Sequence, residues 1–230
     1  MEYNKTTLEK FESFLGNLVL HPDLFKIKNV EMDLKGNLNP SNLLHELYFV
    51  KEKWLSFQEF FDHYFALFKD RIKNQFSFSS HESFSDGLRA RLYRTQFGFL
   101  TEYHAFLLSS ILFTKENVYR NPILDQQGVD FQIKYCGNLF NIHIFVDTPR
   151  AWHFRNYKSA FKNVEKTEGI HVNLPYSLKE GRFNSLRFLK NGFGVYTEKY
   201  FDHFKSEIIS GKIKNNNITG TNENGFIYSH

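Results

Sequence analysis

The sequence predicts a mixed α+β (α/β) protein, with a helical N-terminal half and a C-terminal mixed β-sheet flanked by helices. Two observations support this fold class. The 230 residues contain five prolines, and none lies between positions 41 and 121, so no residue there must break a helix. After Pro122 the apolar residues fall into short runs separated by turn residues, a pattern typical of strands.

Helix-start signals in the N-terminal half support its helical assignment. The signals are capping-box pairs or a cap before a proline: Thr6 with Glu9, Ser56 with Glu59, and Asn39 with Pro40. Apolar residues at helical spacing follow each of them. A longer helix is expected over 85–112, with Gly98 as a point of interruption.

The C-terminal half predicts a β-hairpin followed by further helices and strands. Runs 129–135 and 140–147 form the hairpin, with Cys136-Gly137-Asn138 as its turn. The elements expected next are a helix over 151–166, strands over 170–174 and 192–197, and a helix over 198–209. We expect one domain over 1–230, made of a helical part (1–121), a mixed-sheet core (122–210) and a loose tail (211–230).

Composition excludes several classes of protein. Aromatic residues make up 18% of the chain, too many for a disordered protein. One cysteine, Cys136, rules out an intrachain disulfide framework and a thiolate zinc cage. No apolar run has membrane length and the first ten residues are polar, so we expect a soluble, cytoplasmic protein. A net charge of +4 is compatible with a polyanionic partner but does not require one.

Two carboxylates lie where the predicted hairpin begins, in the run 124–130. Side chains alternate along a strand, so Asp130 shares a face with Lys134, while His143 lies on one face of the returning strand. If the register joins these faces, carboxylates, an imidazole and an amine converge, and the oxygen ligands would suit Mg²⁺. The structural alternative is that Asp125 caps a turn, Asp130 lies at a strand edge, and His143 is a partly buried histidine.

At these residues the chain resembles the TaqI family of restriction endonucleases. The matching blocks follow the family's order and span most of the chain, and the runs 87–95 and 124–130 are the most specific of them. The blocks are Lys10–Leu15, Leu38–Pro40, Phe57–His63, Gly87–Thr95, Leu124–Asp130, Leu174–Leu178 and Asn191–Phe193.

The resemblance implies a homodimeric Type II enzyme that cuts duplex DNA at the palindrome TCGA with Mg²⁺, on a restriction-endonuclease-like core similar to that of the PD-(D/E)xK nucleases. The family's acidic positions fall on Asp125 and Asp130. The cation would polarise a phosphoryl oxygen and lower the pKa of the attacking water. A companion DNA methyltransferase is also implied by the family.

The chain departs from the family at the site lysine. Where the family has an acidic or amide residue followed two positions on by lysine, this chain has His143-Ile144-Phe145. Three alternatives are open. The amine comes from elsewhere, with Lys134 or Lys158 as candidates; or His143 serves as metal ligand or base; or the protein binds DNA without cutting it.

Two groups of basic residues are candidates for DNA contacts. Arg89, Arg91 and Arg94 lie in the long predicted helix, and arginine can bind phosphates or read guanine. Arg150 and Arg155 follow the hairpin, interleaved with aromatic residues, which would suit backbone phosphates. The structural alternative in both cases is a solvated or internally paired helix face.

Overall fold

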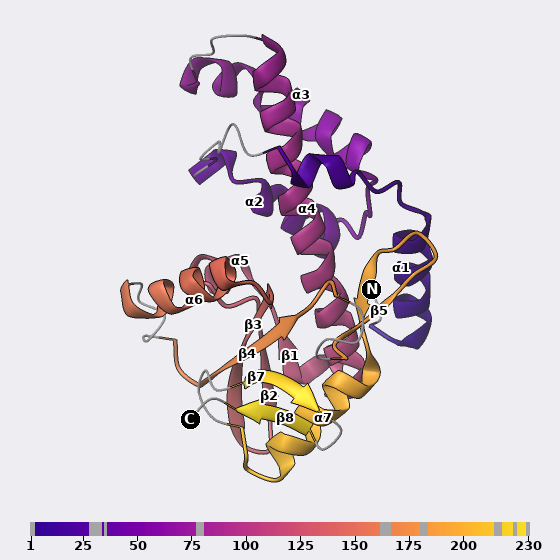
Figure 1. Ribbon diagram of the computed structural model, residues 1–230, viewed down its shortest axis with the longest axis vertical. Coiled ribbons are helices and arrows are strands. Elements are labelled where there is room, and N and C mark those ends of the chain that lie inside the picture. Colours follow the sequence, from indigo (N-terminus) through magenta and orange to yellow (C-terminus); the bar gives the residue numbers. More distant parts are fainter. Residues whose placement is uncertain are drawn as a thin grey trace. The chain divides into compact units, whose positions relative to one another are not determined.

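The structure of the protein is a computed structural model (Figure 1). It describes residues 3–27, 34, 36–76, 81–161, 167–179, 184–213, 218–222 and 225–228. The chain divides into two compact units, which we describe separately. The first consists of residues 14–100, and the second of residues 2–13 together with 101–230.

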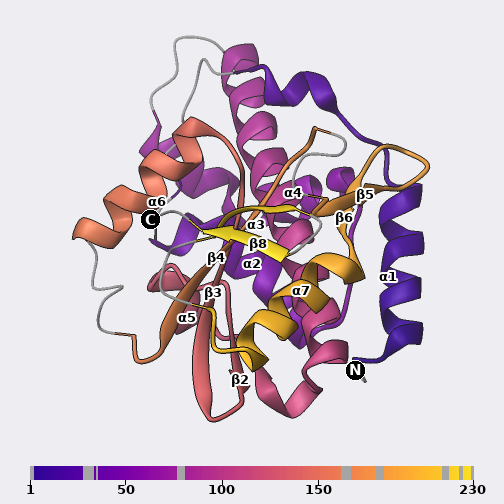
Figure 2. The same cartoon turned by 60° about the horizontal axis from the view of Figure 1, so that its bottom comes forward.

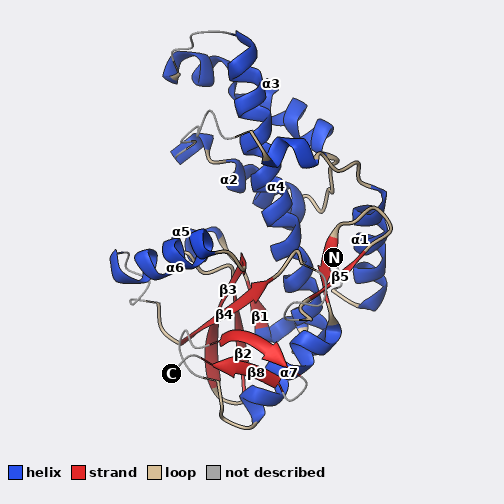
Figure 3. Cartoon of the chain, in the orientation of Figure 1, coloured by secondary structure: helices blue, strands red, loops and turns tan. Residues whose placement is uncertain are grey.

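The described residues of the first unit form helices and connecting loops, with no strand among them (Figure 3). Its main helices are α2 (Pro40–His45), α3 (Phe57–Gln75) and the first part of α4 (His81–Leu112). Shorter elements are the 3₁₀ helices η1 (Pro22–Phe25) and η2 (Gly36–Leu38) and the π-helical turn η3 (Glu46–Val50), and α1 (Lys5–Asn17) ends in this unit. Helix α4 runs without interruption through Gly98, contrary to the expected break.

Two of the three predicted helix starts are confirmed by their hydrogen bonds. Asn39 Oδ1 accepts from the main-chain N–H of Ser41 at the start of α2. Ser56 and Glu59 form a complete capping box at the start of α3. The third prediction, a start of α1 at Thr6 paired with Glu9, is wrong. That helix begins at Lys5, and the Oδ1 of Asn4 accepts from the N–H of Thr7 at 3.0 Å.

The second unit is built on a mixed sheet of four strands in the order β1-β2-β3-β4. The strands are β1 (Val118–Tyr119), β2 (Phe131–Tyr135), β3 (Asn138–Val146) and β4 (Ile170–Tyr176). Pairing is antiparallel from β1 to β3 and parallel between β3 and β4. The predicted hairpin is confirmed, and Cys136 and Gly137 form its turn with φ of 48° and 77°.

The two faces of the sheet differ in chemistry. The face carrying Phe131, Ile142 and Leu174 is apolar and buried. It packs against the end of α4 and against α7 (Glu198–Ile209), through aromatic contacts such as Phe106 with Phe131. The other face is mostly polar and is covered by α6 (Pro149–Phe161), so α6 and α7 lie on opposite sides of the strands (Figure 2).

Two expectations for the C-terminal region need correction. Strand β4 continues through Pro175 instead of ending before it, which is allowed because β4 is an edge strand of this sheet. The tail expected to be loose contains an antiparallel hairpin of β7 (Ile218–Asn222) and β8 (Gly225–Tyr228). A second small sheet pairs β5 (Leu186–Phe188) with β6 (Gly194–Tyr196). Within the described residues no helix is long and apolar enough to cross a membrane.

Candidate active site

Asp130 is held at the point where the chain enters β2. Its Oδ2 accepts a hydrogen bond from the main-chain N–H of Ile144 at 2.5 Å, and its own N–H donates to the carbonyl of Ile142 at 3.0 Å. Both partners belong to β3. The acidic side chain is therefore fixed by the neighbouring strand and not only by its own.

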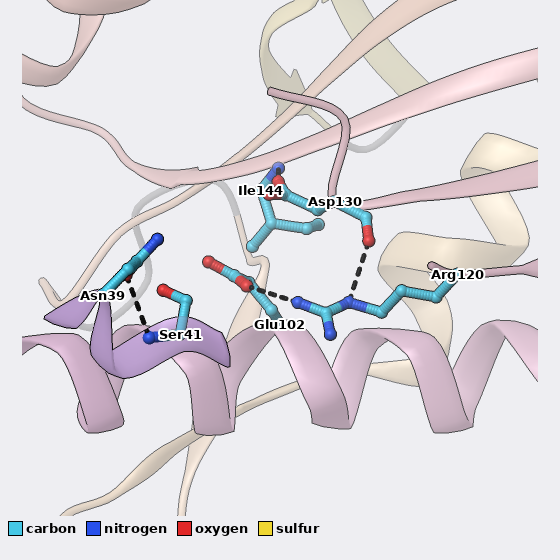
Figure 4. A network of polar contacts seen from close by, with 6 residues as sticks. All are labelled: Asn39, Ser41, Glu102, Arg120, Asp130 and Ile144. Atoms are coloured by element: carbon cyan, nitrogen blue, oxygen red, sulfur yellow. Dashed lines mark hydrogen bonds and ion pairs between the residues drawn. The ribbon is translucent and has the colours of Figure 1, made fainter. Parts of the chain in front are cut away.

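An arginine that the sequence reasoning did not select binds the same residue (Figure 4). Arg120 Nε donates to the main-chain oxygen of Asp130 at 3.0 Å, and its Nη2 lies 3.5 Å from Glu102 Oε2 on α4. The Arg120 side chain is 3% exposed and that of Glu102 is 24% exposed. Arg120 thus connects the edge of the sheet to the helix behind it.

Burial raises the pKa of the Asp130 carboxyl group to about 6. The hydrogen bond from Ile144 acts in the opposite direction, and the negative charge of Asp125 raises the pKa further. The positive charges of Arg120 and Arg155 lower it. The site therefore combines two acids and two cations whose charges interact.

Asp125 lies in the short helix α5 (Pro122–Gln126), which leads into the turn before β2. The helix is capped by Asn121, whose Oδ1 accepts from the N–H of Leu124 at 2.9 Å. Gly128 closes the turn with a φ of 79°, a conformation that favours glycine, and donates to the carbonyl of Asp125 at 2.9 Å. The half-buried Asp125 is brought to the same end of the hairpin as Asp130, as predicted from its position before β2.

His143 is buried and both of its ring nitrogens have partners. Its Nδ1 lies 2.8 Å from the carbonyl oxygen of Gly128, which can only accept, so Nδ1 carries the proton. Its Nε2 lies 2.9 Å from the Nδ1 of His171 on β4. Binding of a metal ion by His143 would require one of these bonds to break. In this structure His143 supports the acidic turn through Gly128.

The polar chain continues across the sheet beyond the two histidines. Asn141 Nδ2 lies 3.5 Å from the Nε2 of His171 and donates to the carbonyl of Glu168 at 3.1 Å. The Oδ1 of Asn141 accepts from Gln132 at 2.7 Å, and the register pairs these two residues, so the polar faces of β2 and β3 meet. With both imidazoles neutral, the bonds that lead from Gln132 through Asn141 and His171 to His143 all donate in the direction of Gly128.

Phe145, at the position where the resemblance leads us to expect lysine, makes an apolar contact in this protein. Phe145 packs edge to face against Trp152 of α6, with ring centroids 4.8 Å apart. Lys134 is exposed near the far end of β2, so the structure does not bring its amine to Asp130. The side chain of Lys158 lies outside the described part of the structure, and its assignment stays a prediction.

The cation that the structure does place near the acids is Arg155. It was predicted as a contact to backbone phosphates, which stays a prediction, and it is 7% exposed and points at the sheet. Its Nε donates to Asn173 Oδ1 on β4 at 2.9 Å. Burial lowers the pKa of its guanidinium to about 10, while the charge of Asp130 acts in the opposite direction.

The other predicted DNA contacts have varied surroundings, and their role stays a prediction. In the first unit, Arg89 lies over the rings of Phe57 and Phe61 at 5.4 and 4.7 Å, and Arg91 donates to Thr95. Arg94 Nη1 donates to the carbonyl of Ile27 at 2.9 Å, a bond that holds the main chain. In the second unit, Arg150 is exposed at the start of α6 and lies over the ring of Phe154.

Four residues near the site were missed: Glu102, Arg120, His171 and Asn173. A signal existed for the last two, because the predicted strand 170–174 alternates apolar and polar residues, with His171 and Asn173 on one face. The register sets them opposite Asn141 and His143. Nothing comparable marked Arg120 or Glu102, whose pairing depends on the fold.

The two aspartates fit a divalent cation. Mg²⁺ usually binds proteins through one or two carboxylates and completes its shell with waters and substrate phosphates. Asp125 and Asp130 supply two such groups, close enough for their charges to interact. No third His, Cys, Asp or Glu completes a metal-binding group within the described residues. The donor set suits a cation shared with the substrate rather than one enclosed by protein.

The fold and the family match together define the class of protein: a mixed α+β protein with a restriction-endonuclease-like core. A model of the TaqI restriction endonuclease family matches residues 8–184, and the chain belongs to this family. The chain is 31% identical over 227 residues to the Type II restriction enzyme TaqI of Thermus aquaticus, with 84% of each chain covered.

A second relative is the Type II restriction enzyme TthHB8I of Thermus thermophilus. It is 33% identical over 155 residues, which cover 63% of this chain and 59% of that enzyme. A comparison with solved structures gave no match.

Proposed function

We propose that this protein is a Mg²⁺-dependent Type II restriction endonuclease that hydrolyses phosphodiester bonds of duplex DNA at a short palindrome. TCGA is the proposed target because of the resemblance to the TaqI family. The observation that carries the proposal is the fixed Asp130 carboxylate beside Asp125, in a site that also contains arginine. This combination suits a cation and a phosphate at one place.

The chain's own residues prepare the site for hydrolysis. Ile144 and Arg120 hold Asp130, and His143 holds the turn that carries Asp125. In the reaction a water oxygen bonds to phosphorus, one P–O bond of the DNA backbone breaks, and the leaving oxygen takes a proton. A bound Mg²⁺ would supply Lewis-acid charge to the phosphoryl oxygen and to the attacking water.

Recognition of a palindrome implies a two-fold arrangement on the DNA, so we propose that the protein acts as a homodimer. Exposed Arg150 is the best placed of the predicted contacts for a backbone phosphate, because its charge is at the surface. A DNA methyltransferase that protects the same sequence would accompany an active enzyme.

The test uses two duplexes that differ only in one site, TCGA in the first and TGCA in the second. The protein is expected to cut only the first, in Mg²⁺ and not in EDTA. No cleavage of either duplex with Mg²⁺ or Mn²⁺, together with retained binding, would contradict the proposal. That result would identify the protein as a DNA-binding relative that does not cleave.

A further inference from the structure

Two arginines have positive charges that act on the Asp130 carboxylate, and their surroundings differ. Arg120 binds the main-chain oxygen of Asp130 and forms an ion pair with Glu102. Its charge therefore already faces an opposite charge. Arg155 Nε donates to the side-chain oxygen of Asn173, and the charge of Asp130 acts on its guanidinium. Arg120 holds the main chain of Asp130, whereas Arg155 is held on the polar face of the sheet by a side chain of β4.

The position of Arg155 follows from the packing of α6 on the sheet. Trp152 and Arg155 are three residues apart and so share one side of the helix. Trp152 packs edge to face against Phe145 of β3, and its indole N–H donates to Asp147 at 2.7 Å. Arg155 then lies over Asn173, which is paired in register with His143. The aromatic contact at Phe145 therefore fixes a guanidinium on the face of the sheet that carries His143.

Burial of this guanidinium, which is 7% exposed, has a thermodynamic cost. An arginine removed from water is destabilising unless its charge is well compensated, and apolar residues of similar volume often replace buried ion pairs without loss of stability. In return, a cation in a site of low dielectric acts more strongly on a nearby charge than one in water. A fixed cation of this kind is suited to a reaction in which negative charge develops.

We propose that Arg155, held by Asn173, supplies positive charge beside Asp130 during phosphodiester hydrolysis. This charge takes the place of an amine at position 145. Negative charge increases on the phosphoryl group as water bonds to phosphorus and the P–O bond breaks. Arg155 makes and breaks no covalent bond in this step and keeps its proton. The inference rests on the proposed function, since it assumes that the protein cleaves DNA.

The test is the single-turnover cleavage rate of the TCGA duplex with enzyme in excess and Mg²⁺ present. Arg155→Gln and Arg155→Met are expected to reduce the rate by about 10²–10³-fold, the usual loss for one fixed charge-stabilising group. Binding of the duplex in EDTA is expected to change by less than about threefold, because the group acts in the transition state. Arg155→Lys, which keeps the charge, should recover at least about tenfold of the loss.

The most specific experiment restores a positive charge at the position that Phe145 occupies. Phe145→Lys in the Arg155→Met background is expected to raise the cleavage rate at least about tenfold over Arg155→Met alone. A merely structural role for Arg155 predicts no such rescue. Arg71→Gln, at an exposed arginine of α3, is the matched control, and its rate should equal that of the wild type.

Thermal unfolding of each variant shows whether it is folded before its rate is compared. If Arg155→Gln does not fold, Arg155→Met and Arg155→Lys provide the same comparison. Wild-type rates in folded Arg155→Gln or Arg155→Met would overturn the inference and leave the proposed function intact. Absence of cleavage by the wild type itself would overturn both.

Discussion

The main-chain N–H of Ile144 donates to the carboxylate of Asp130 at 2.5 Å, across the boundary between β2 and β3. Through this bond Asp130, which directly precedes β2, is oriented by a residue of β3. Arg120 binds the main-chain oxygen of the same residue, so Asp130 is held at its side chain and at its backbone. A carboxylate fixed in this way presents its remaining oxygen in one direction, as a metal ligand requires.

Stability should depend on pH through Asp130. Its pKa is raised from 3.8 to about 6 in the folded protein, mainly by burial. A raised pKa means that the folded state favours the protonated form, so this contribution is present below pH 4 and is lost as the pH rises through 6. The loss amounts to roughly 2–3 kcal/mol.

Asp130→Asn is therefore expected to be more stable than the wild type at pH 8, and the difference should shrink toward pH 4. Urea unfolding of both proteins across this range measures it. An Asn variant that is less stable than the wild type at pH 8 would contradict the raised pKa of Asp130.

Mg²⁺ should bind at the two aspartates. A cation that binds only the folded protein raises its stability, by about 2.7 kcal/mol at a concentration one hundred times the dissociation constant. We expect Mg²⁺ to raise the melting temperature of the wild type and to have a much smaller effect on the Asp125→Asn/Asp130→Asn variant. EDTA should reverse the wild-type shift. An equal shift in both proteins would place the cation elsewhere.

His143 should matter for stability even without a metal ion. His143→Ala removes a buried ring and leaves the carbonyl of Gly128 and the imidazole of His171 without this partner. The expected loss is about 2–4 kcal/mol in the free energy of unfolding. His153→Ala is the control, because His153 is exposed on α6 and its loss should change stability by less than about 0.5 kcal/mol. If His143→Ala unfolds like the wild type in EDTA, the role in holding the turn is wrong.

Arg94 and Arg150 should behave differently when replaced. Arg94→Ala removes the hydrogen bond to the carbonyl of Ile27 and is expected to lower stability by about 1–2 kcal/mol. Arg150→Ala should leave stability unchanged but weaken DNA binding and reduce the salt dependence of affinity by about one phosphate contact. Salt titrations of DNA binding, alongside urea unfolding, separate the two effects. Lower stability of Arg150→Ala together with weaker DNA binding by Arg94→Ala would contradict these two roles.

Local signals in the sequence predicted the local structure well. The capping box at Ser56, the cap at Asn39 and the hairpin turn at Cys136 each depend on residues within a few positions of one another. The acidic run also predicted that two aspartates come directly before a strand, and both precede β2 in the structure. The β7–β8 hairpin was missed because its strands are short and polar and lie in a segment rich in Asn and Gly.

The parts of the site that the sequence did not reveal depend on pairing between distant segments. His171 meets His143 because β4 pairs with β3 in parallel, a register that no local pattern specifies. Arg155 faces the sheet, and the spacing of basic and aromatic residues in its helix does not show which of them is buried. The pairing of Arg120 with Glu102 joins a strand edge to a helix and has no sequence signature.

The central claim is that Asp130 is part of a cleavage site for DNA. The most direct measurement is the single-turnover cleavage rate of a TCGA duplex in Mg²⁺ by the wild type and by Asp130→Ala, with thermal unfolding to show that both are folded. We predict cleavage by the wild type and none that can be measured by folded Asp130→Ala. Equal cleavage by the two proteins would contradict the assignment of the site.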